Sequence, residues 1–238
     1  MDWNKLESGR RAWQPNEPIS EKSRAGATIS RCLALTPLEP AVAGFISDGL
    51  SKADLKKLGE DCIHTLRLNI LDEEKHELAL TRAKTAMVDY NPSYEKEALE
   101  LIQAWQDLPD PEIVKAAVLE NSIFFLILPL YSLFGGTALS ISSNSISSDE
   151  RIHVASHRTA AQLLGIKPSK AMNSLRLETV RFIGADIDEE IGDRWTLERL
   201  YRNSDSLLKR GVSDLVETQA SVVLAPYEIN SQHFDKYS

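Results

Sequence analysis

The sequence predicts an all-α protein, a four-helix core with accessory helices, and three observations support this fold class. Apolar residues recur at helical spacing through most of the chain after residue 36. Strand signals are few, and the best of them, at residues 222–224, is short. Hydrophobic residues make up 42% and charged residues 26% of the 238 residues, so the chain can bury a sizeable core beneath a solvated surface.

The chain divides into three parts. Residues 1–35 are polar and include Pro15 and Pro18, so we expect an irregular N-terminal arm that packs on the body or on a partner. Residues 36–220 carry the helical signals and form the predicted domain. Residues 221–238 are expected to form an irregular C-terminal tail.

Two helices are predicted at the start of the domain. Thr36 followed by Pro37 is an N-cap with proline at the first helical position, and this helix should end near Gly49. Ser51 is the expected N-cap of the second helix. Apolar residues keep a helical period from there to about Val88, so this helix is expected to run without interruption.

The later elements are also predicted to be helical. Residues 93–108 form an amphipathic helix. The helix predicted at 112–134 is apolar on most of its circumference and should therefore lie in the core. A serine-rich segment leads into a further helix that Gly165 ends, and two or three additional helices are expected within 169–220.

Two of the predicted helices carry the pattern Asp-Glu-x-x-His, as "DEEKH" at 72–76 and "DERIH" at 149–153. Positions i and i+3 share one face of a helix, so Glu73 with His76, and Glu150 with His153, can each point at one metal ion. A bundle that binds two metal ions needs this arrangement, with a single glutamate from each of two other helices. The repeated pattern therefore predicts a di-metal site.

That requirement predicts a core-facing glutamate on a helix before each pattern. Before the second stands Glu120, in the most apolar helix of the chain, where an unpaired carboxylate would be costly. Before the first, Glu39 is preferred, because it precedes Glu73 by 34 residues and Glu120 precedes Glu150 by 30, which suggests two similar helical hairpins. Glu60 is the alternative, although it shares a predicted helix with Glu73 and would lie about 20 Å away along the axis.

Three further polar residues accompany the predicted ligands. A metal-bound imidazole usually donates its other N–H to a carboxylate, so Asp72 is expected to contact His153, and Asp149 to contact His76, across the bundle. His157 follows His153 by four residues on the same face. It is a candidate for an extra ligand, a nearby base or an ordinary polar residue.

Each candidate also has an ordinary structural interpretation. Glu120 could reach solvent or pair with Lys115. Glu39 lies in the first turn of its predicted helix, so its only role could be a favourable interaction with the helix dipole. Asp72 and Asp149 could be exposed.

The set Glu39, Glu73-x-x-His76, Glu120 and Glu150-x-x-His153 resembles the ferritin-like di-iron carboxylate superfamily. "VLENSIFFLILPLYSLF" and "SSDERIHVASH" are similar to the third and fourth core helices of ribonucleotide reductase small subunits and related N-oxygenases, and the resemblance covers roughly residues 36–165. It implies two iron ions, with Fe/Mn or Mn/Mn as alternatives, bridged by Glu73 and Glu150 and reacting with O₂. The segment "ELALTRAKTAM" lacks the tyrosine that reductase small subunits carry there, so a tyrosyl-radical role is not expected.

The predicted function is that of an O₂-activating non-haem di-iron oxidoreductase, a monooxygenase or an oxidase, acting on a small organic substrate. Its electron donor should be a separate reductase, because the chain has no Gly-x-Gly-x-x-Gly motif for a bound nicotinamide or flavin. Ile123, Phe124, Phe125 and Leu128 are candidates to line the substrate pocket or are ordinary core. The alternatives are a non-enzymatic ferritin-like iron-binding or iron-oxidising protein, and a metal-free helical interaction protein.

Composition narrows the expected partners. A net charge of −8 and a pI near 5.2 argue against general binding to nucleic acid or to anionic membranes. No apolar signal segment opens the chain and the longest apolar run is short for a membrane span, so a cytoplasmic protein without membrane contact is expected. A homodimer is also expected. The spacing of Cys32 and Cys62 does not favour a thiolate zinc site or a disulfide framework.

Overall fold

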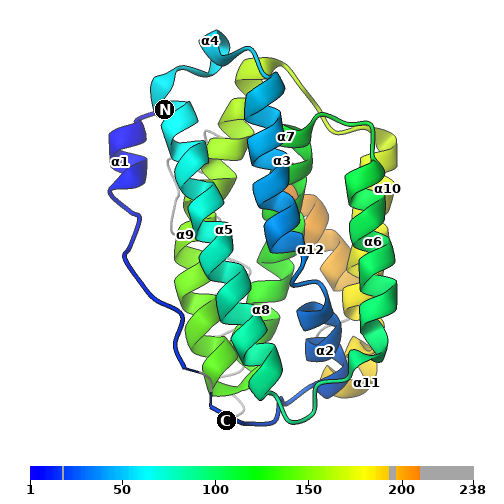
Figure 1. The fold of residues 1–238 in the computed structure, drawn as a ribbon. Helices are drawn as coiled ribbons and strands as arrows, with labels where there is room; N and C mark the ends of the chain where they lie inside the picture. The colour runs from blue at the N-terminus through cyan, green and yellow to red at the C-terminus, as the bar shows by residue number, and fades with distance from the viewer. Residues whose placement is uncertain (18, 193–196, 210–238) are drawn as a thin grey trace.

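The computed structural model describes residues 1–17, 19–192 and 197–209, and in these residues the protein is all-helical (Figure 1). The elements are α1 (Trp3–Glu7), α2 (Gly26–Ala34), α3 (Leu38–Lys52), α4 (Leu55–Leu58), α5 (Glu60–Ala86), the 3₁₀ turn η1 (Pro92–Tyr94), α6 (Glu95–Asp107), α7 (Glu112–Val118), the π-helix η2 (Leu119–Phe124), α8 (Phe125–Phe134), α9 (Gly136–Leu164), α10 (Lys170–Gly184), α11 (Ile187–Ile191) and α12 (Leu197–Lys209). Within the described residues, the only β-type pairing is an isolated bridge between Glu21 and Met87.

Four long helical segments pack against one another around the centre of the molecule. They are α3, α5, α9 and the continuous stretch α7–η2–α8. Figure 1 shows that α3 and α5 form a hairpin closed by α4, and that α6 and α10 lie on the opposite side of the molecule from α1. The α3–α5 and α8–α9 hairpins therefore place four helices side by side.

Close approach between α3 and α7 depends on Gly49. A Cβ atom built on this residue would lie 2.6 Å from the side chain of Ile113.

Gly136, which opens α9, has a φ of +83°, a backbone conformation that favours glycine. The carboxylate of Glu21 accepts a hydrogen bond from the backbone N–H of Ala138, with 2.7 Å between N and Oε1, and so satisfies a donor in the first turn of α9.

Part of the predicted N-terminal arm is a buried helix. Residues 1–35 were expected to be irregular, but they contain α1 and α2, and Ile29, Cys32 and Leu33 of α2 lie in the core. The spacing i, i+3, i+4 gives α2 one apolar face. Its two turns are too short to stand out from the polar sequence around them. Residues 8–17 and 19–24 between these helices are mostly without regular structure, as expected.

The expectation of one uninterrupted helix from Ser51 to Val88 is also wrong. The first helix continues through Ser51 to Lys52, and the chain then forms the short α4 before α5 begins at Glu60. Gly59 separates α4 from α5 with a φ of +76°. The apolar period continues across this break, which is why the pattern did not reveal it.

The C-terminal predictions are tested only in part. Helices are expected within 169–220, and α10, α11 and α12 occupy the described part of that range. The expectations for 210–220, for the strand signal at 222–224 and for the irregular tail at 221–238 lie outside the described residues.

Two helical stretches have the length and hydropathy of a membrane-spanning helix. They are Gly26–Lys52, whose most apolar window is 72% buried, and Glu112–Phe134, whose window is entirely buried inside the protein. A core helix that is packed on all sides can have the same length and hydropathy as a membrane-spanning helix. The burial of both stretches fits this explanation.

Candidate metal centre

Six side chains from four helical segments converge in the middle of the molecule. Each is at most 3% exposed. They are Glu39 of α3, Glu73 and His76 of α5, Glu120 of η2, and Glu150 and His153 of α9. One ligand-type atom from each of Glu73, His76, Glu150 and His153 lies within 4.8 Å of the others, so this group could hold a metal ion.

The carboxylates of Glu73 and Glu150 lie between the two imidazoles. Glu73 places Oε2 3.6 Å from Nδ1 of His76 and Oε1 3.0 Å from Nδ1 of His153. Glu150 does the same, with Oε1 3.4 Å from His76 and Oε2 3.7 Å from His153. Each carboxylate thus presents one oxygen to each histidine, which is the arrangement of a bridging ligand between two ions.

The remaining two glutamates complete opposite ends of the cluster. Oε2 of Glu39 lies 3.5 Å from Nδ1 of His76. Oε1 of Glu120 lies 3.4 Å from Nδ1 of His153. Each histidine therefore faces three carboxylates, one terminal and two shared. The alternative glutamate, Glu60, is exposed at the start of α5 and does not reach the cluster.

Two aspartates contact the outer nitrogens of the histidines across the bundle. Nε2 of His76 lies 3.3 Å from Oδ2 of Asp149, and Nε2 of His153 lies 3.3 Å from Oδ2 of Asp72. A carboxylate acceptor at Nε2 holds the proton there and leaves the lone pair of Nδ1 facing the cluster. Both contacts are the ones expected from the sequence.

The N-terminal segment covers these aspartates from outside. The indole N–H of Trp13 donates to Asp149, and the Trp13 ring stacks on His76 with 6.1 Å between ring centroids. Arg10 forms an ion pair with Asp72, and Lys75 reaches the same carboxylate at 2.5 Å. Sequence reasoning missed Arg10 and Trp13, because nothing in the local pattern connects an irregular segment with residues more than 60 positions away.

His157 lies beside the cluster but outside the group of four. Its Nδ1 is 3.7 Å from Oε1 of Glu120, and its Nε2 is 3.3 Å from the amide nitrogen of Asn69. The amide donates to Nε2, so the ring proton belongs on Nδ1 and faces Glu120. This tautomer places an N–H, and not a lone pair, toward the cluster, so it favours a neutral neighbour of Glu120 over an additional ligand.

Glu120 belongs to a π-helix that the sequence did not predict. Residues Leu119–Phe124 form a single wide turn between α7 and α8. Such turns insert an extra residue into a helix and often occur at functional sites. Lys115, the other partner considered for Glu120, instead donates to the backbone carbonyl of Gln106 at 3.0 Å. Lys115 therefore does not pair with the buried carboxylate, which instead faces His153 and His157.

Burial and mutual repulsion set the protonation of the metal-free cluster. Burial raises the pKa of Glu39 and of Glu120 well above the usual carboxyl range, and neighbouring carboxylates add to the shift. Burial opposes ionisation of Glu73 too, but His153 and His76 hold its pKa well below the usual value. Burial would lower the pKa of His76, yet its four acidic neighbours raise it. Burial lowers the pKa of His157 to about 3, so that ring is neutral.

The unpaired atoms of the cluster fit a metal ion. The buried atoms without a hydrogen-bond partner include both carboxylate oxygens of Glu73, Glu120 and Glu150, Oε2 of Glu39, and Nδ1 of His76 and His153. Buried polar atoms are nearly always satisfied, so such a concentration needs an explanation. Ligand atoms about 2 Å from an octahedral ion lie about 3 Å apart, close to the separations found here.

A small cavity lies beside Glu39. Its volume is about 10 Å³, and its walls include Glu39, Leu80, Phe124, Leu128 and Tyr131. Phe124 and Leu128, two of the four candidates for a substrate pocket, line this small cavity, but a substrate pocket is not tested by it. Ile123 and Phe125 are buried but do not line this cavity.

In comparisons with protein-family models, curated proteins and solved structures, none matched this chain.

Proposed function

We propose that the cluster binds two iron ions and that the protein is a ferritin-like, O₂-activating di-iron oxidoreductase. The observation that carries this proposal is the placement of Glu73 and Glu150, each with one oxygen toward His76 and the other toward His153. A mononuclear site would not require two carboxylates to be shared in this way. The resemblance in the metal-ligand pattern supports the superfamily assignment.

The charge balance supports two divalent cations. The four glutamates of the cluster carry four negative charges when ionised, and two divalent ions neutralise them. The two aspartates outside the cluster have cationic partners of their own, because Arg10 and Lys75 both contact Asp72 and Lys75 lies 3.9 Å from Asp149. Buried charge is tolerated only when it is paired or coordinates a metal.

The donor set supports iron or manganese. Carboxylate oxygens with two imidazoles suit hard or intermediate cations, whereas thiolates select zinc or copper(I). Cys32 and Cys62 are buried and free, and neither belongs to the group of close ligand atoms. Burial raises the pKa of both thiols, which keeps them in the protonated form.

Iron bound here would supply the reduction of O₂. A monooxygenase reaction consumes one O₂, two electrons and two protons, places one oxygen atom in the substrate and releases the other as water. The electrons would come from a separate reductase. Asp72 and Asp149 fix the imidazole tautomers, and His157 holds a proton on Nδ1 facing Oε1 of Glu120.

One observation favours a second candidate, an iron-oxidising protein without an organic substrate. The cavity beside Glu39, at about 10 Å³, holds about one water-sized molecule. That is too small for an organic substrate. Under the first candidate, substrate entry requires movement of the surrounding side chains.

Anaerobic loading with Fe(II), followed by exposure to O₂, tests the proposal. We expect two iron ions per chain and new absorption in the near-ultraviolet and visible range after O₂ is added. The variant Glu73→Gln should lose both ions, while Glu60→Gln should behave as the wild type. A chain that binds no iron would leave the metal-free helical interaction protein as the conclusion. Continued turnover of excess Fe(II) without an added reductant would favour the second candidate.

A further inference from the structure

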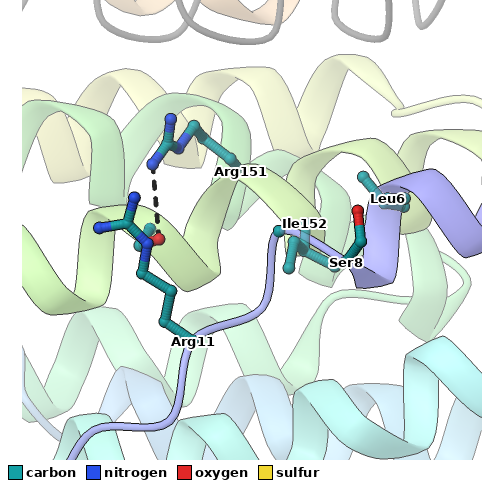
Figure 2. A pocket seen from close by; sticks show the side chains of 7 residues that line it. Leu6, Ser8, Arg11, Arg151 and Ile152 are labelled. Atoms are coloured by element: carbon teal, nitrogen blue, oxygen red, sulfur yellow. Dashed lines mark hydrogen bonds between the residues drawn. The ribbon is translucent and has the colours of Figure 1, made fainter.

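A second site lies on the surface between the N-terminal segment and α9 (Figure 2). It is a pocket of about 230 Å³ with two walls. Leu6, Ser8 and Arg11 belong to the N-terminal wall, and Ser148, Arg151 and Ile152 belong to the α9 wall. We call it the Arg11–Arg151 pocket.

Two guanidinium groups meet in this pocket. Figure 2 shows the side chains of Arg11 and Arg151 extending toward one another. Among the described residues, neither arginine forms an ion pair with a carboxylate, and Arg151 has only a long contact of 3.4 Å to the hydroxyl of Ser148. The chain has 35 acidic and 27 basic residues, so two adjacent arginines without an acid stand out.

Nearby acids do not neutralise the pocket. Asp149 and Glu150 adjoin Arg151 in sequence, but Asp149 contacts His76 and Trp13, and Glu150 belongs to the metal centre. Glu7 pairs with Arg10.

We propose that the Arg11–Arg151 pocket binds a small phosphate dianion, either inorganic phosphate or a phosphate monoester. Two guanidinium groups balance two negative charges and offer forked N–H donors that match phosphate oxygens. Ser148 adds a hydroxyl group at the pocket wall, whereas the hydroxyl of Ser8 already donates to the backbone carbonyl of Lys5. The buried side chains of Leu6 and Ile152 form an apolar floor suited to the carbon atoms of a small monoester.

The site would connect ligand binding with the cover of the metal centre. Because its two walls come from different segments, the pocket exists only while the N-terminal segment lies on α9. That same segment carries Arg10 and Trp13, which contact Asp72 and Asp149. A phosphate bound between Arg11 and Arg151 would therefore stabilise the form in which the N-terminal segment covers the centre. Conversely, docking of the segment on α9 would increase the affinity for phosphate.

Calorimetric titration of the full-length protein with inorganic phosphate, at low ionic strength, tests the site. We expect saturable binding to one site per chain, and a loss of affinity of about tenfold or more in each of Arg11→Gln and Arg151→Gln, because each change removes charge-assisted hydrogen bonds. Arg11→Lys keeps the positive charge but loses the paired N–H donors of the guanidinium group. Its affinity for phosphate should therefore lie between those of the wild type and Arg11→Gln. Arg67→Gln, an exposed arginine of α5 that does not line the pocket, is the matched control and should bind as the wild type.

Two further titrations identify the ligand class. Glycerol 3-phosphate should bind at least as tightly as inorganic phosphate if the apolar floor is used, whereas acetate should bind more weakly than either because it carries a single charge. Equal binding of acetate and phosphate would contradict the assignment to a dianion. Absence of phosphate binding, or binding unchanged in both glutamine variants, would overturn the site itself. Neither result depends on whether the metal centre contains iron.

Limited trypsin digestion tests the coupling. Cleavage after Arg10 or Arg11 should slow when phosphate is present, while cleavage after the exposed Lys56 or Lys57 of α4 should not change. In Arg151→Gln the protection by phosphate should disappear although Arg10 and Arg11 are intact. Equal protection in the wild type and in this variant would contradict the proposed link between the segment and α9.

Discussion

The indole nitrogen of Trp13 lies 2.7 Å from Oδ2 of Asp149 and donates a hydrogen bond to it. The two residues are 136 positions apart. Asp149 in turn contacts His76, so a residue of the N-terminal segment reaches the candidate metal centre through one intermediate side chain. The N-terminal segment that covers the cluster is thus linked, through Asp149, to the candidate ligand His76.

Replacing Trp13 with phenylalanine removes the donor and keeps an aromatic ring against His76. We expect metal affinity to fall about threefold to tenfold, the usual range for one hydrogen bond. Titration of the metal-free protein with Mn(II) measures the change. Trp3→Phe is the control, because Trp3 packs near Leu6 and has no contact with Asp149. Equal affinity in wild type and Trp13→Phe would show that the bond does not support the ligands.

Asp149→Asn and Asp72→Asn remove the carboxylates that orient the histidines. We expect each to weaken metal binding by about 10- to 100-fold, because such outer partners fix the imidazole tautomer and increase its basicity. Competition with a metal chelator measures the affinity. Asp61→Asn, at an exposed position of α5, should have no effect. A loss no larger than in this control would contradict the orienting role.

Glu120→Gln should have opposite effects on stability and on metal binding. Without metal, the change removes an ionisable group from a fully buried site, so we expect the free energy of unfolding to rise by about 1–3 kcal/mol. Bound iron should fall from two ions per chain to one or none. Urea unfolding of metal-free protein and elemental analysis of loaded protein measure the two effects. A variant that keeps two ions would exclude Glu120 as a ligand.

Metal affinity should fall as the pH is lowered, beginning above the ordinary carboxyl range. The pKa values of Glu39, Glu120 and His76 are raised, so these groups bind protons more tightly than in the unfolded chain, and a metal must displace those protons. Calorimetry of Mn(II) binding between about pH 6 and pH 7.5, in buffers of different ionisation enthalpy, should show proton release. Affinity independent of pH over this range would mean that the ligands are already deprotonated.

Gly49→Ala and Gly44→Ala are a matched pair within α3. A methyl group at Gly49 would overlap Ile113 of α7, so we expect a loss of about 1–3 kcal/mol in the free energy of unfolding. Gly44 has no atom within 4 Å of the added carbon, and alanine there should stabilise the helix by about 0.5–1 kcal/mol. Thermal unfolding of both variants checks the packing that positions Glu39.

The four helical segments that supply the cluster were largely predictable from local sequence. Hydrophobic period, the proline at 37 and the glycine at 165 indicated α3, α8 and α9. The similar spacing of the two Glu-x-x-His patterns from Glu39 and Glu120, 34 and 30 residues, indicated which glutamates could join them. These signals are local or repeat along the chain, and periodicity can therefore reveal them.

Other features of the structure could not be predicted from the hydrophobic period or from residue spacing. The break at Gly59 leaves the apolar period intact, and the π-helix around Glu120 has no distinct composition. The buried helix α2 is too short to rise above its polar surroundings. The contacts of Arg10 and Trp13 depend on where an irregular segment lies, which no periodic pattern encodes.

The sequence by itself determined an all-helical chain and a repeated ligand pattern on two helices, because both follow from the 3.6-residue period of the α-helix. Only the tertiary structure decided that Glu39 rather than Glu60 reaches His76, that Glu73 and Glu150 lie between two imidazoles, and that the N-terminal segment covers their aspartate partners. These outcomes depend on packing between segments far apart in the chain. Their free energy comes from the burial of the whole core and not from any local preference.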